Sequence, residues 1–305
     1  MSFIDYQTLL SGAFMTTVTH PMSYCKLLIQ IGHEPLAPVI RRNVFFRKQL
    51  QYPNILQYLK HIKTTDGLFG LYRGLQPRLM ANLSMSISHM AMVKQLDQCC
   101  ESEPFTNEGV NKIVKKVSID TCKEMTAKCC AIIVSHPFHV IALRSMAQFV
   151  GHETYYSSFF SSIKEIYNED GIMGFFVGLL PRLVLEITQI WICNILSHIL
   201  NTYVLNDQSD LGELRQYSQA VTSYVASVVT YPLTLTSTMV VVSGSRLAAG
   251  NPPHMDVYDG WLSCIKDLRQ RGLSSRGSSL FFRPVIRPLD QHNSYMMAPS
   301  PPIPR

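Results

Sequence analysis

Three prolines in matching contexts each interrupt a long apolar stretch of this chain. They lie in the pairs His20-Pro21, His136-Pro137 and Tyr231-Pro232. Proline lacks the backbone N–H that a helix interior needs, and its ring clashes with the preceding turn, so a helix that contains it must bend there. The sequence therefore predicts three related units, each of which opens with an apolar helix bent by its proline.

A second motif follows the proline helix in the first two units. The first unit carries Asp66-Gly67, Tyr72-Arg73-Gly74 and Pro77-Arg78, and the second carries Asp170-Gly171, Phe176-Val177-Gly178 and Pro181-Arg182. Two compound matches at one spacing indicate an internal repeat. In the third unit Arg271-Gly272 stands where the acid-glycine pair belongs, and we expect Phe281-Phe282-Arg283 to be the counterpart of the second element at a longer spacing.

The composition favours a membrane protein. Of 305 residues, 47% are hydrophobic and only 16% are charged. No run of about twenty purely apolar residues stands out, so the helices must be long and amphipathic around a polar interior. The net charge of +6 is spread along the chain without a recognised nucleic-acid-binding motif, so we predict no nucleic-acid partner.

The basic residues gather locally only at 41–48. Arg41-Arg42 and Arg47-Lys48 enclose Phe45 and Phe46 there. Basic and aromatic side chains in one short segment are typical of a segment that docks on anionic lipid. A plain solvated loop explains them equally well.

The hydrophobic pattern predicts five membrane helices and three short surface helices. We expect the membrane helices at about 6–31, 75–96, 116–148, 179–205 and 213–242. The surface helices are expected at 54–65, 158–169 and 258–271, each ended near a glycine. The repeat requires a sixth membrane helix after residue 283, but residues 284–305 contain six prolines, which a helix in lipid does not accommodate. We predict a Pro-rich tail there that is disordered or lies on the surface.

This layout resembles the mitochondrial solute carriers, which carry a proline motif with an acid and a base on odd helices and an acid-glycine signature before even helices. The resemblance implies an all-α membrane protein with a threefold repeat, in which five of the family's six transmembrane helices are present. The carrier-like domain is expected over 1–283, with repeats at about 6–105, 113–207 and 213–283, and the tail over 284–305. The fold-signature residues are Pro21, Pro137, Pro232, Gly67, Gly74, Gly171 and Gly178.

The charged gate of the solute carriers is not present in this chain. In the family, an acid two residues after each proline and a base five residues after it form ion pairs between helices. Here the acid positions hold Ser23, His139 and Thr234, and the base positions hold Lys26, Ala142 and Ser237. Because Lys26 alone cannot form a ring of ion pairs, we expect gated solute exchange to be lost.

Polar residues form a stripe along nearly every expected membrane helix. The residues expected to line the interior are Thr19, Ser23, Lys26, Gln30, Arg78, Asn82, Ser86, His89, Ser135, His139, Arg182, Glu186 and Gln189. Without a sixth helix, this lining would open sideways to lipid as a polar groove, which is expensive to maintain in a bilayer. Groups retained at such a cost are candidates for moving polar matter across the hydrocarbon layer, either the polar end of a helix or a lipid headgroup.

Several of these residues also have a purely structural interpretation. Lys26 has a long stem that could reach the interface without a role, and Glu186 could simply pair with Arg182, four residues away. His89 and His139 could be interior hydrogen-bonding residues rather than pH sensors.

The sequence carries no recognised catalytic or metal-binding motif. Its eight cysteines form no C-x-x-C pair, and no Gly-x-Ser-x-Gly, P-loop or dinucleotide fingerprint occurs. We therefore predict free thiols, no metal, no cofactor and no enzymatic activity.

Two further runs resemble a divergent branch of the carrier family that lies in the outer mitochondrial membrane. They are Ser135 to Ile141, with Leu143 to Met146 after it, and Arg276 to Arg283. That resemblance implies a multi-pass protein of the mitochondrial outer membrane that inserts tail-anchored and other α-helical membrane proteins and associates with pro-apoptotic truncated BID. The leading hypothesis is an insertase whose partners are membrane lipids and helical client proteins. A docking receptor for truncated BID, a phospholipid scramblase and a solute carrier with a relaxed gate are the alternatives.

Overall fold

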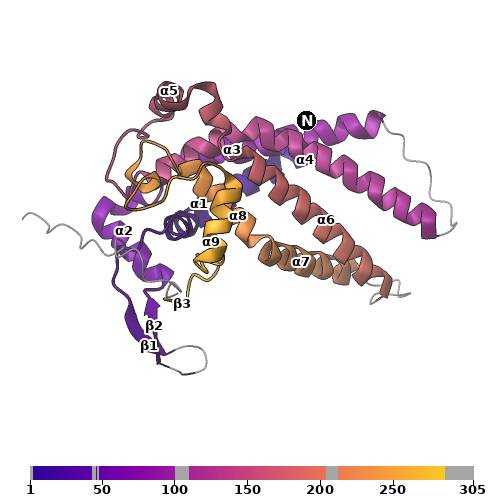
Figure 1. Ribbon diagram of the computed structural model, residues 1–305. Helices are drawn as coiled ribbons and strands as arrows, with labels where there is room; N and C mark the ends of the chain where they lie inside the picture. The colour runs from indigo at the N-terminus through magenta and orange to yellow at the C-terminus, as the bar shows by residue number, and fades with distance from the viewer. Residues whose placement is uncertain (1–2, 43–45, 47, 100–109, 204–211, 286–305) are drawn as a thin grey trace, which may run out of the picture.

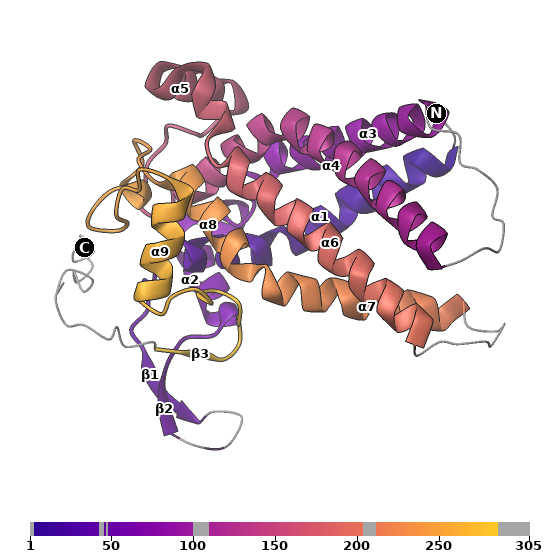
Figure 2. The same ribbon diagram turned by 45° about the vertical axis from the view of Figure 1, so that its right-hand side comes forward.

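Long helices make up most of the protein, for which the computed structural model describes residues 3–42, 46, 48–99, 110–203 and 212–285. The long helices are α1 (Phe3–Gln30), α3 (Leu75–Cys99), α4 (Val110–Ala147), α6 (Leu179–Tyr203), α7 (Gly212–Val229) and α8 (Tyr231–Val242). In chain order, α1 packs against α3, α3 against α4, α4 against α6, and α6 against α7 and α8. Figures 1 and 2 show these helices crowded together at one end and spread apart toward the other.

Short helices cover the crowded end. They are α2 (Ile55–Gly70), α5 (Phe159–Asp170) with the 3₁₀ turn η1 (Gly171–Phe176), the 3₁₀ turn η2 (Ala248–Gly250), and α9 (Trp261–Gln270). α2, α5 and α9 are amphipathic, and α2 for example turns Ile55, Tyr58 and Ile62 inward. Their bounds agree with the three expected surface helices to within a few residues, except that α2 continues past a kink at Gly67.

The three prolines act in two different ways. Pro21 and Pro137 lie inside the continuous helices α1 and α4. Pro232 lies instead in the first turn of α8, after a break at Thr230 that bends α7 and α8 by 57°. The first turn of a helix tolerates proline because the missing N–H would have no partner there. The single helix expected at 213–242 is therefore a bent pair.

The residue before each proline makes the same kind of hydrogen bond in all three units. His20 Nε2 lies 3.0 Å from the carbonyl oxygen of Arg73, His136 Nε2 lies 3.0 Å from that of Val177, and the Tyr231 hydroxyl donates to that of Arg276 at 2.7 Å. Each of these carbonyls precedes a glycine with positive φ, namely Gly74, Gly178 and Gly277. The threefold repeat therefore extends to the hydrogen bonds of its loops.

The third unit requires a correction to the alignment expected from the sequence. Its counterpart of Gly74 and Gly178 is Gly277, which follows Gly272 after fewer residues than Gly74 follows Gly67. The loop is therefore shorter in the third unit, and the expectation of a longer spacing up to Phe281-Phe282-Arg283 was wrong. The sequence did not reveal the shorter loop, because an arginine stands before Gly272 where the acid of the motif belongs.

Each of the three loop glycines packs against the proline helix of the next unit. A Cβ on Gly74 would lie 3.0 Å from the Ala142 oxygen of α4, and one on Gly178 would lie 3.3 Å from the Ser237 oxygen of α8. A Cβ on Gly277 would lie 3.0 Å from Gln30 Cγ of α1, so the third unit returns to the first. These contacts close a ring at the crowded end, which we call the closed end.

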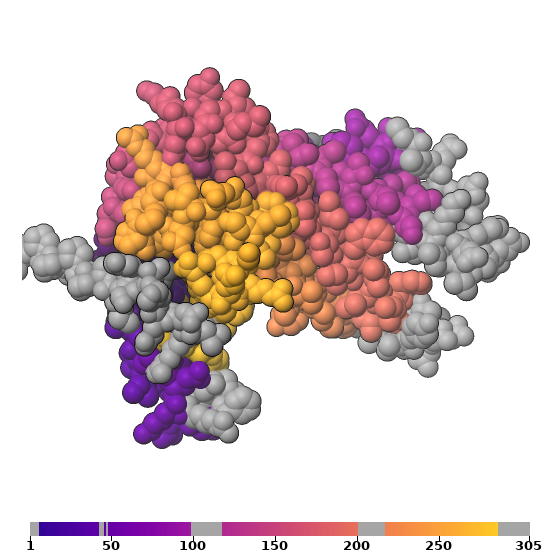
Figure 3. All heavy atoms as spheres, viewed as in Figure 1, coloured from indigo at the N-terminus to yellow at the C-terminus, as the bar shows by residue number. Residues whose placement is uncertain are grey.

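A small sheet adds β structure to a fold expected to be all-α. It contains β1 (Val39–Arg42), β2 (Lys48–Tyr52) and β3 (Arg283–Pro284), antiparallel in the order β1-β2-β3. Strands this short carry little periodic signal, and β3 is far from its partner in sequence. Of the predicted tail, Pro284 and Val285 belong to the described residues, and the rest lies outside them. In Figure 3 the β1–β2 hairpin projects from the helical body.

The apolar core lies at the closed end, where Tyr24, Leu28, Ile141, Phe149 and Leu235 are buried together. In the described part of the chain, two helical stretches are long and apolar enough to cross a membrane, Ser118–Ala147 and Phe159–Leu200, and α7 with α8 makes a third if the bent pair is one span. α1 and α3 have 28 and 25 residues, which is long enough for a crossing, but polar side chains interrupt them.

Candidate functional site: the polar lining of the long helices

Side chains of α1, α3 and α4 line a cavity of about 400 Å³ in which polar groups lie among leucines and methionines. Asn82 of α3 donates through Nδ2 to the Thr16 hydroxyl of α1 at 3.0 Å. Ser86, His89 and Lys128 line the same cavity, with Lys128 coming from α4. The structure therefore brings together three residues of the α3 stripe, as the helical spacing indicated. His89 also lines a second cavity of about 230 Å³ between α3 and α4, which adds acidic and basic side chains.

A second polar group joins α4 to α6. His136 Nε2 faces the Val177 carbonyl, which can only accept, so this nitrogen carries a hydrogen and donates it. His136 Nδ1 is then free to accept from Arg182 Nη1, which lies 3.3 Å away. The His139 ring lies beside the His136 ring, with 6.0 Å between the centroids. Because guanidinium N–H groups can only donate, the Arg182 contact leaves His136 Nδ1 as an acceptor, and His136 is neutral here.

Glu186 lies one turn beyond Arg182 on α6 and is half-buried. Glu186 and Arg182 attract each other, but they form no salt bridge, and Arg182 turns its Nη1 to His136 instead. No salt bridge between described residues includes Glu186, Lys128 or Arg78. Charges at the depth of membrane helices are costly when they are unpaired, so these three need water, lipid phosphate or a bound partner.

The polar residues along α1 make two kinds of contact, either with the backbone of their own helix or with Tyr231 of α8. The hydroxyls of Thr19 and Ser23 donate to carbonyl oxygens of their own helix, at 2.8 and 3.2 Å. Lys26 holds its Nζ over the Tyr231 ring, 5.6 Å from the centroid. Gln30 is only 5% exposed and donates through Nε2 to the Tyr231 hydroxyl at 3.2 Å. Lys26 and Gln30 therefore contact the junction between α1 and α8.

Two residues of the expected lining contribute nothing to an accessible surface. Gln30 belongs to the closed end, and Ser135 is fully buried and donates to the Ile132 carbonyl of its own helix. Neither residue belongs to the accessible polar lining. Gln189 is half-buried on α6, on the same helix as Glu186.

Sequence reasoning missed several polar contacts at the spread end of the helices. Asn194 of α6 donates to the Thr121 hydroxyl at 3.0 Å and lies 3.4 Å from Glu124 Oε2, both on α4. Ser197 of α6 lies 3.2 Å from the Thr222 hydroxyl of α7. Isolated threonines give little signal, because a threonine in a helix commonly bonds to its own backbone.

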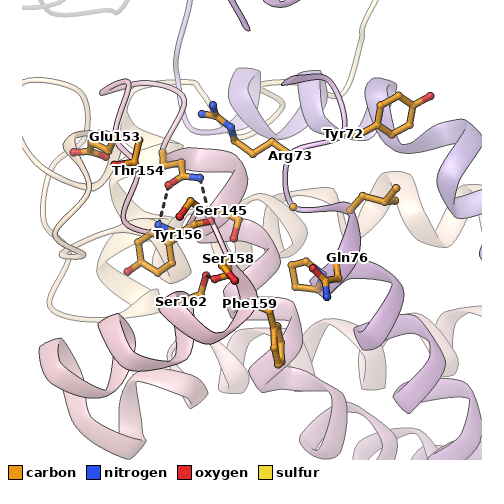
Figure 4. A pocket seen from close by; sticks show the side chains of 15 residues that line it. Tyr72, Arg73, Gln76, Ser145, Glu153, Thr154, Tyr156, Ser158, Phe159 and Ser162 are labelled. Atoms are coloured by element: carbon orange, nitrogen blue, oxygen red, sulfur yellow. Dashed lines mark hydrogen bonds between the residues drawn. The ribbon is translucent and has the colours of Figure 1, made fainter. Parts of the chain in front are cut away.

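A separate polar pocket of about 350 Å³ lies at the closed end, between the loop before α3 and the loop before α5 (Figure 4). The Gln148 side chain ties the second loop by donating to the Tyr156 carbonyl at 3.2 Å and accepting from the Tyr156 N–H at 2.9 Å. Arg73 and Glu153 contribute charge to the wall. The pocket therefore lies between the first and second units, apart from the polar lining of the helices.

Two arginines, Arg144 buried and Arg276 half-buried, hold the closed end together. Arg144 is 1% exposed, lies 3.4 Å from Glu169 and 3.0 Å from Asp170, and donates through Nε to the Val241 carbonyl at 3.2 Å. Arg276 donates through Nε to the Gln30 carbonyl at 2.9 Å. Each arginine thus caps the last turn of the next unit's proline helix, whose carbonyls have no partner within the helix. This end of the protein is tied by ion pairs and backbone contacts.

The fold signatures, the repeat contacts and the helical lining are those of a carrier, and comparison with known proteins agrees. The family described as mitochondrial carrier protein matches residues 8–102 and 118–206. The chain belongs to the mitochondrial carrier family, and membership indicates a mitochondrial membrane protein.

Individual relatives identify the branch. Mitochondrial carrier homolog 2 of Bos taurus is 42% identical over 281 residues, which cover 90% of this chain and 93% of that protein, and the protein of the same name from Homo sapiens gives the same values. Mitochondrial carrier homolog 1 of Mus musculus is 39% identical over 292 residues, covering 90% of this chain and 75% of that protein. The resemblance to a divergent branch of the family, expected from the runs at 135–146 and 276–283, is confirmed as a similarity to mitochondrial carrier homolog 2.

Proposed function

We propose that this protein inserts tail-anchored and other α-helical proteins into the mitochondrial outer membrane. In this proposal α1, α3, α4, α6 and the bent pair α7–α8 cross the membrane, and their polar lining opens sideways to lipid between α7 and α1. The contacts between long helices support such an opening away from the closed end: α1 meets α8 at the closed end, but no extensive contact between described residues joins α7 to α1.

The observation that carries the proposal is the unpaired charge on the long helices. Glu186 and Lys128 lie on α6 and α4 without a salt bridge to another described residue. A half-buried charge without a salt-bridge partner keeps water near it or awaits a polar partner. The polar end of a client helix is such a partner, and it gains hydrogen bonds where it would otherwise meet hydrocarbon.

The mechanism follows because such a lining has lipid on one side and polar side chains on the other. The client's apolar helix stays in lipid beside the opening, while its short polar end moves along Asn82, Ser86, His89 and Glu186. Each hydrogen bond that these side chains offer lowers the barrier to insertion. Moving a polar group from water into hydrocarbon without a partner costs roughly several kcal/mol. The protein changes only the rate, because the inserted helix is already favoured by burial of its apolar side chains.

Solute transport by alternating access fits the structure less well. Carriers exchange solute by opening each end in turn through ion pairs on the proline helices, and this chain has Ser23, His139 and Thr234 at the acid positions. Its closed end is tied in addition by the buried Arg144 and the half-buried Arg276. A stable closure at one end suits entry from the side rather than passage from end to end.

The test is insertion of a fluorescent tail-anchored client into liposomes that contain the purified protein. We expect stimulation by the wild type, loss of most of it in Glu186→Leu and in Lys128→Leu, and a smaller loss in the matched variant Glu186→Gln, which keeps hydrogen-bonding capacity without the charge. Normal insertion by equally abundant, folded leucine variants would rule out the polar-lining mechanism. Binding of truncated BID without insertion would favour a docking receptor, and lipid exchange between leaflets without insertion would favour a scramblase.

A further inference from the structure

The β-hairpin at the closed end has one face whose described side chains are all exposed. In the register of β1 with β2, Ile40 lies opposite Leu50 and Arg42 lies opposite Lys48. Side chains of opposite residues, and of residues two apart, share one face of a sheet. All four are exposed, Ile40 by 68%. We call these four residues the hairpin face.

The opposite face attaches the hairpin to the protein. Gln51 is buried, and Arg41 donates through Nη2 to the Gln57 side chain of α2 at 2.9 Å. At the base, Arg283 of β3 pairs with Glu34 and donates to the Pro53 carbonyl at 3.0 Å. Because Arg283 is itself buried, these contacts attach the base of the hairpin to the fold and set its direction.

The hairpin face is unfavourable when it stands in water alone. Arg42 and Lys48 are like charges directly opposite each other, an arrangement that destabilises a pair of strands. Neither forms a salt bridge with a described residue. Ile40 and Leu50 expose apolar surface beside them, and Phe46 beyond the strands is 81% exposed. An anionic surface with hydrocarbon beneath it would cover both kinds of side chain.

The hairpin extends in the direction expected of a segment that lies along a membrane surface. Figures 1 and 2, which differ by a turn of 45°, both show it extending across the direction of the long helices, from the end that α2 and α9 cover. Figure 3 shows it projecting beyond the neighbouring elements. In a protein whose long helices cross a membrane, a segment that runs across them at one end lies along the membrane surface.

We propose that the hairpin face binds the anionic phospholipid headgroups of the membrane in which the protein lies. Arg42 and Lys48 pair with lipid phosphates, which removes their mutual repulsion. Ile40, Leu50 and Phe46 enter the boundary between headgroups and acyl chains. Because this site is outside the polar lining, the inference does not depend on the insertion of client proteins.

The test is hydrogen exchange of the full chain in nanodiscs of phosphatidylcholine, with and without added phosphatidylserine. We expect the amides of residues 39–42 and 48–52 to exchange more slowly with the anionic lipid, by about fivefold or more, which is roughly what one basic side chain near an anionic surface contributes. High salt should remove most of the difference, because it screens exposed charges.

Two sets of variants make the test specific. Arg42→Glu with Lys48→Glu should abolish the response to phosphatidylserine, whereas Lys164→Glu with Lys266→Glu, the same charge change on exposed lysines of α5 and α9, should keep it. Arg42→Gln with Lys48→Gln relieves the repulsion, so this hairpin should stay folded in neutral lipid and still lose the response. Equal exchange in the two lipid mixtures would overturn the proposal, as would slowing by inorganic phosphate or by an acidic client peptide in neutral lipid.

Discussion

The hydroxyl of Tyr231 donates a 2.7 Å hydrogen bond to the carbonyl of Arg276, and it does for the third repeat what a histidine nitrogen does for the other two. The same hydroxyl accepts from Gln30 of the first repeat at 3.2 Å. A histidine ring nitrogen bonded to a carbonyl has no lone pair left for an incoming donor. Tyrosine therefore joins the last repeat to the first through one oxygen.

Removing that oxygen should loosen the closed end. In Tyr231→Phe, the Gln30 amide and the Arg276 carbonyl each lose a partner, and we expect the free energy of unfolding to fall by about 1–2 kcal/mol. Unfolding in detergent micelles, followed by circular dichroism, measures it. Tyr224→Phe on the exposed side of α7 is the control and should be neutral. Equal stability of Tyr231→Phe and wild type would show that this junction is not closed in solution.

Gly277 should resist substitution although it lies in a loop. Its φ is +80°, and a Cβ would lie 3.0 Å from Gln30 Cγ and 3.1 Å from the Tyr231 hydroxyl. Gly277→Ala combines backbone strain with a tight contact, so we expect a loss of about 1–3 kcal/mol in the same unfolding measurement. Gly260→Ala serves as the comparison, because Gly260 has extended backbone and open space around its Cα. Similar effects of the two changes would contradict the third repeat contact.

Arg144 should be among the most sensitive charged residues of the closed end. Arg144→Gln leaves Glu169 and Asp170 without their cation and the Val241 carbonyl without its donor. Breaking a buried ion pair from one side costs about 3–5 kcal/mol. Arg246→Gln, which removes an exposed pair with Glu165, should cost less than about 1 kcal/mol. Yield of folded protein and unfolding in micelles distinguish the two.

Stability should fall in mild acid because of His33. Burial lowers the pKa of this side chain from 6.5 to about 4, and nearby histidines oppose its charge further. The folded state thus binds its proton less readily than the unfolded chain does, so the stability is complete above about pH 6.5 and decreases as the pH falls toward 4. We expect a loss on the order of 1–3 kcal/mol across that range. His33→Asn should flatten the pH dependence, and an unchanged slope would assign the effect to other groups.

The hydrophobic periodicity and the positions of the prolines and glycines were enough to predict the repeat. The prolines, the glycines and the amphipathic segments before them gave the surface helices within a few residues, whereas the one helix expected at 213–242 is the bent pair α7–α8. The stripe on α3 likewise placed Asn82, Ser86 and His89 around one cavity. These features are local, since each depends on neighbours within one helix or one loop.

What the sequence did not reveal depends on distant contacts. The β3 strand pairs with β2 across most of the chain, and neither segment has a strand pattern of its own. Gly277 could be recognised only from its contact with α1, since the third loop is shorter than the others. Gln30 looked like a lining residue because it continues the α1 stripe, but Tyr231 from another repeat takes its amide.

The ring closure has a consequence for how the protein is made. Arg276 bonds to a carbonyl 246 positions earlier in the chain, and Arg283 pairs with Glu34 across 249 positions. Contacts of such long range form late, after the entropy of closing a long loop has been lost. The first helix therefore leaves the ribosome long before its partners exist, with polar groups at its end still unsatisfied. The closed end can therefore form only after residues 276–283 have been synthesised, and until then the last turn of α1 lacks the partner that covers its carbonyls.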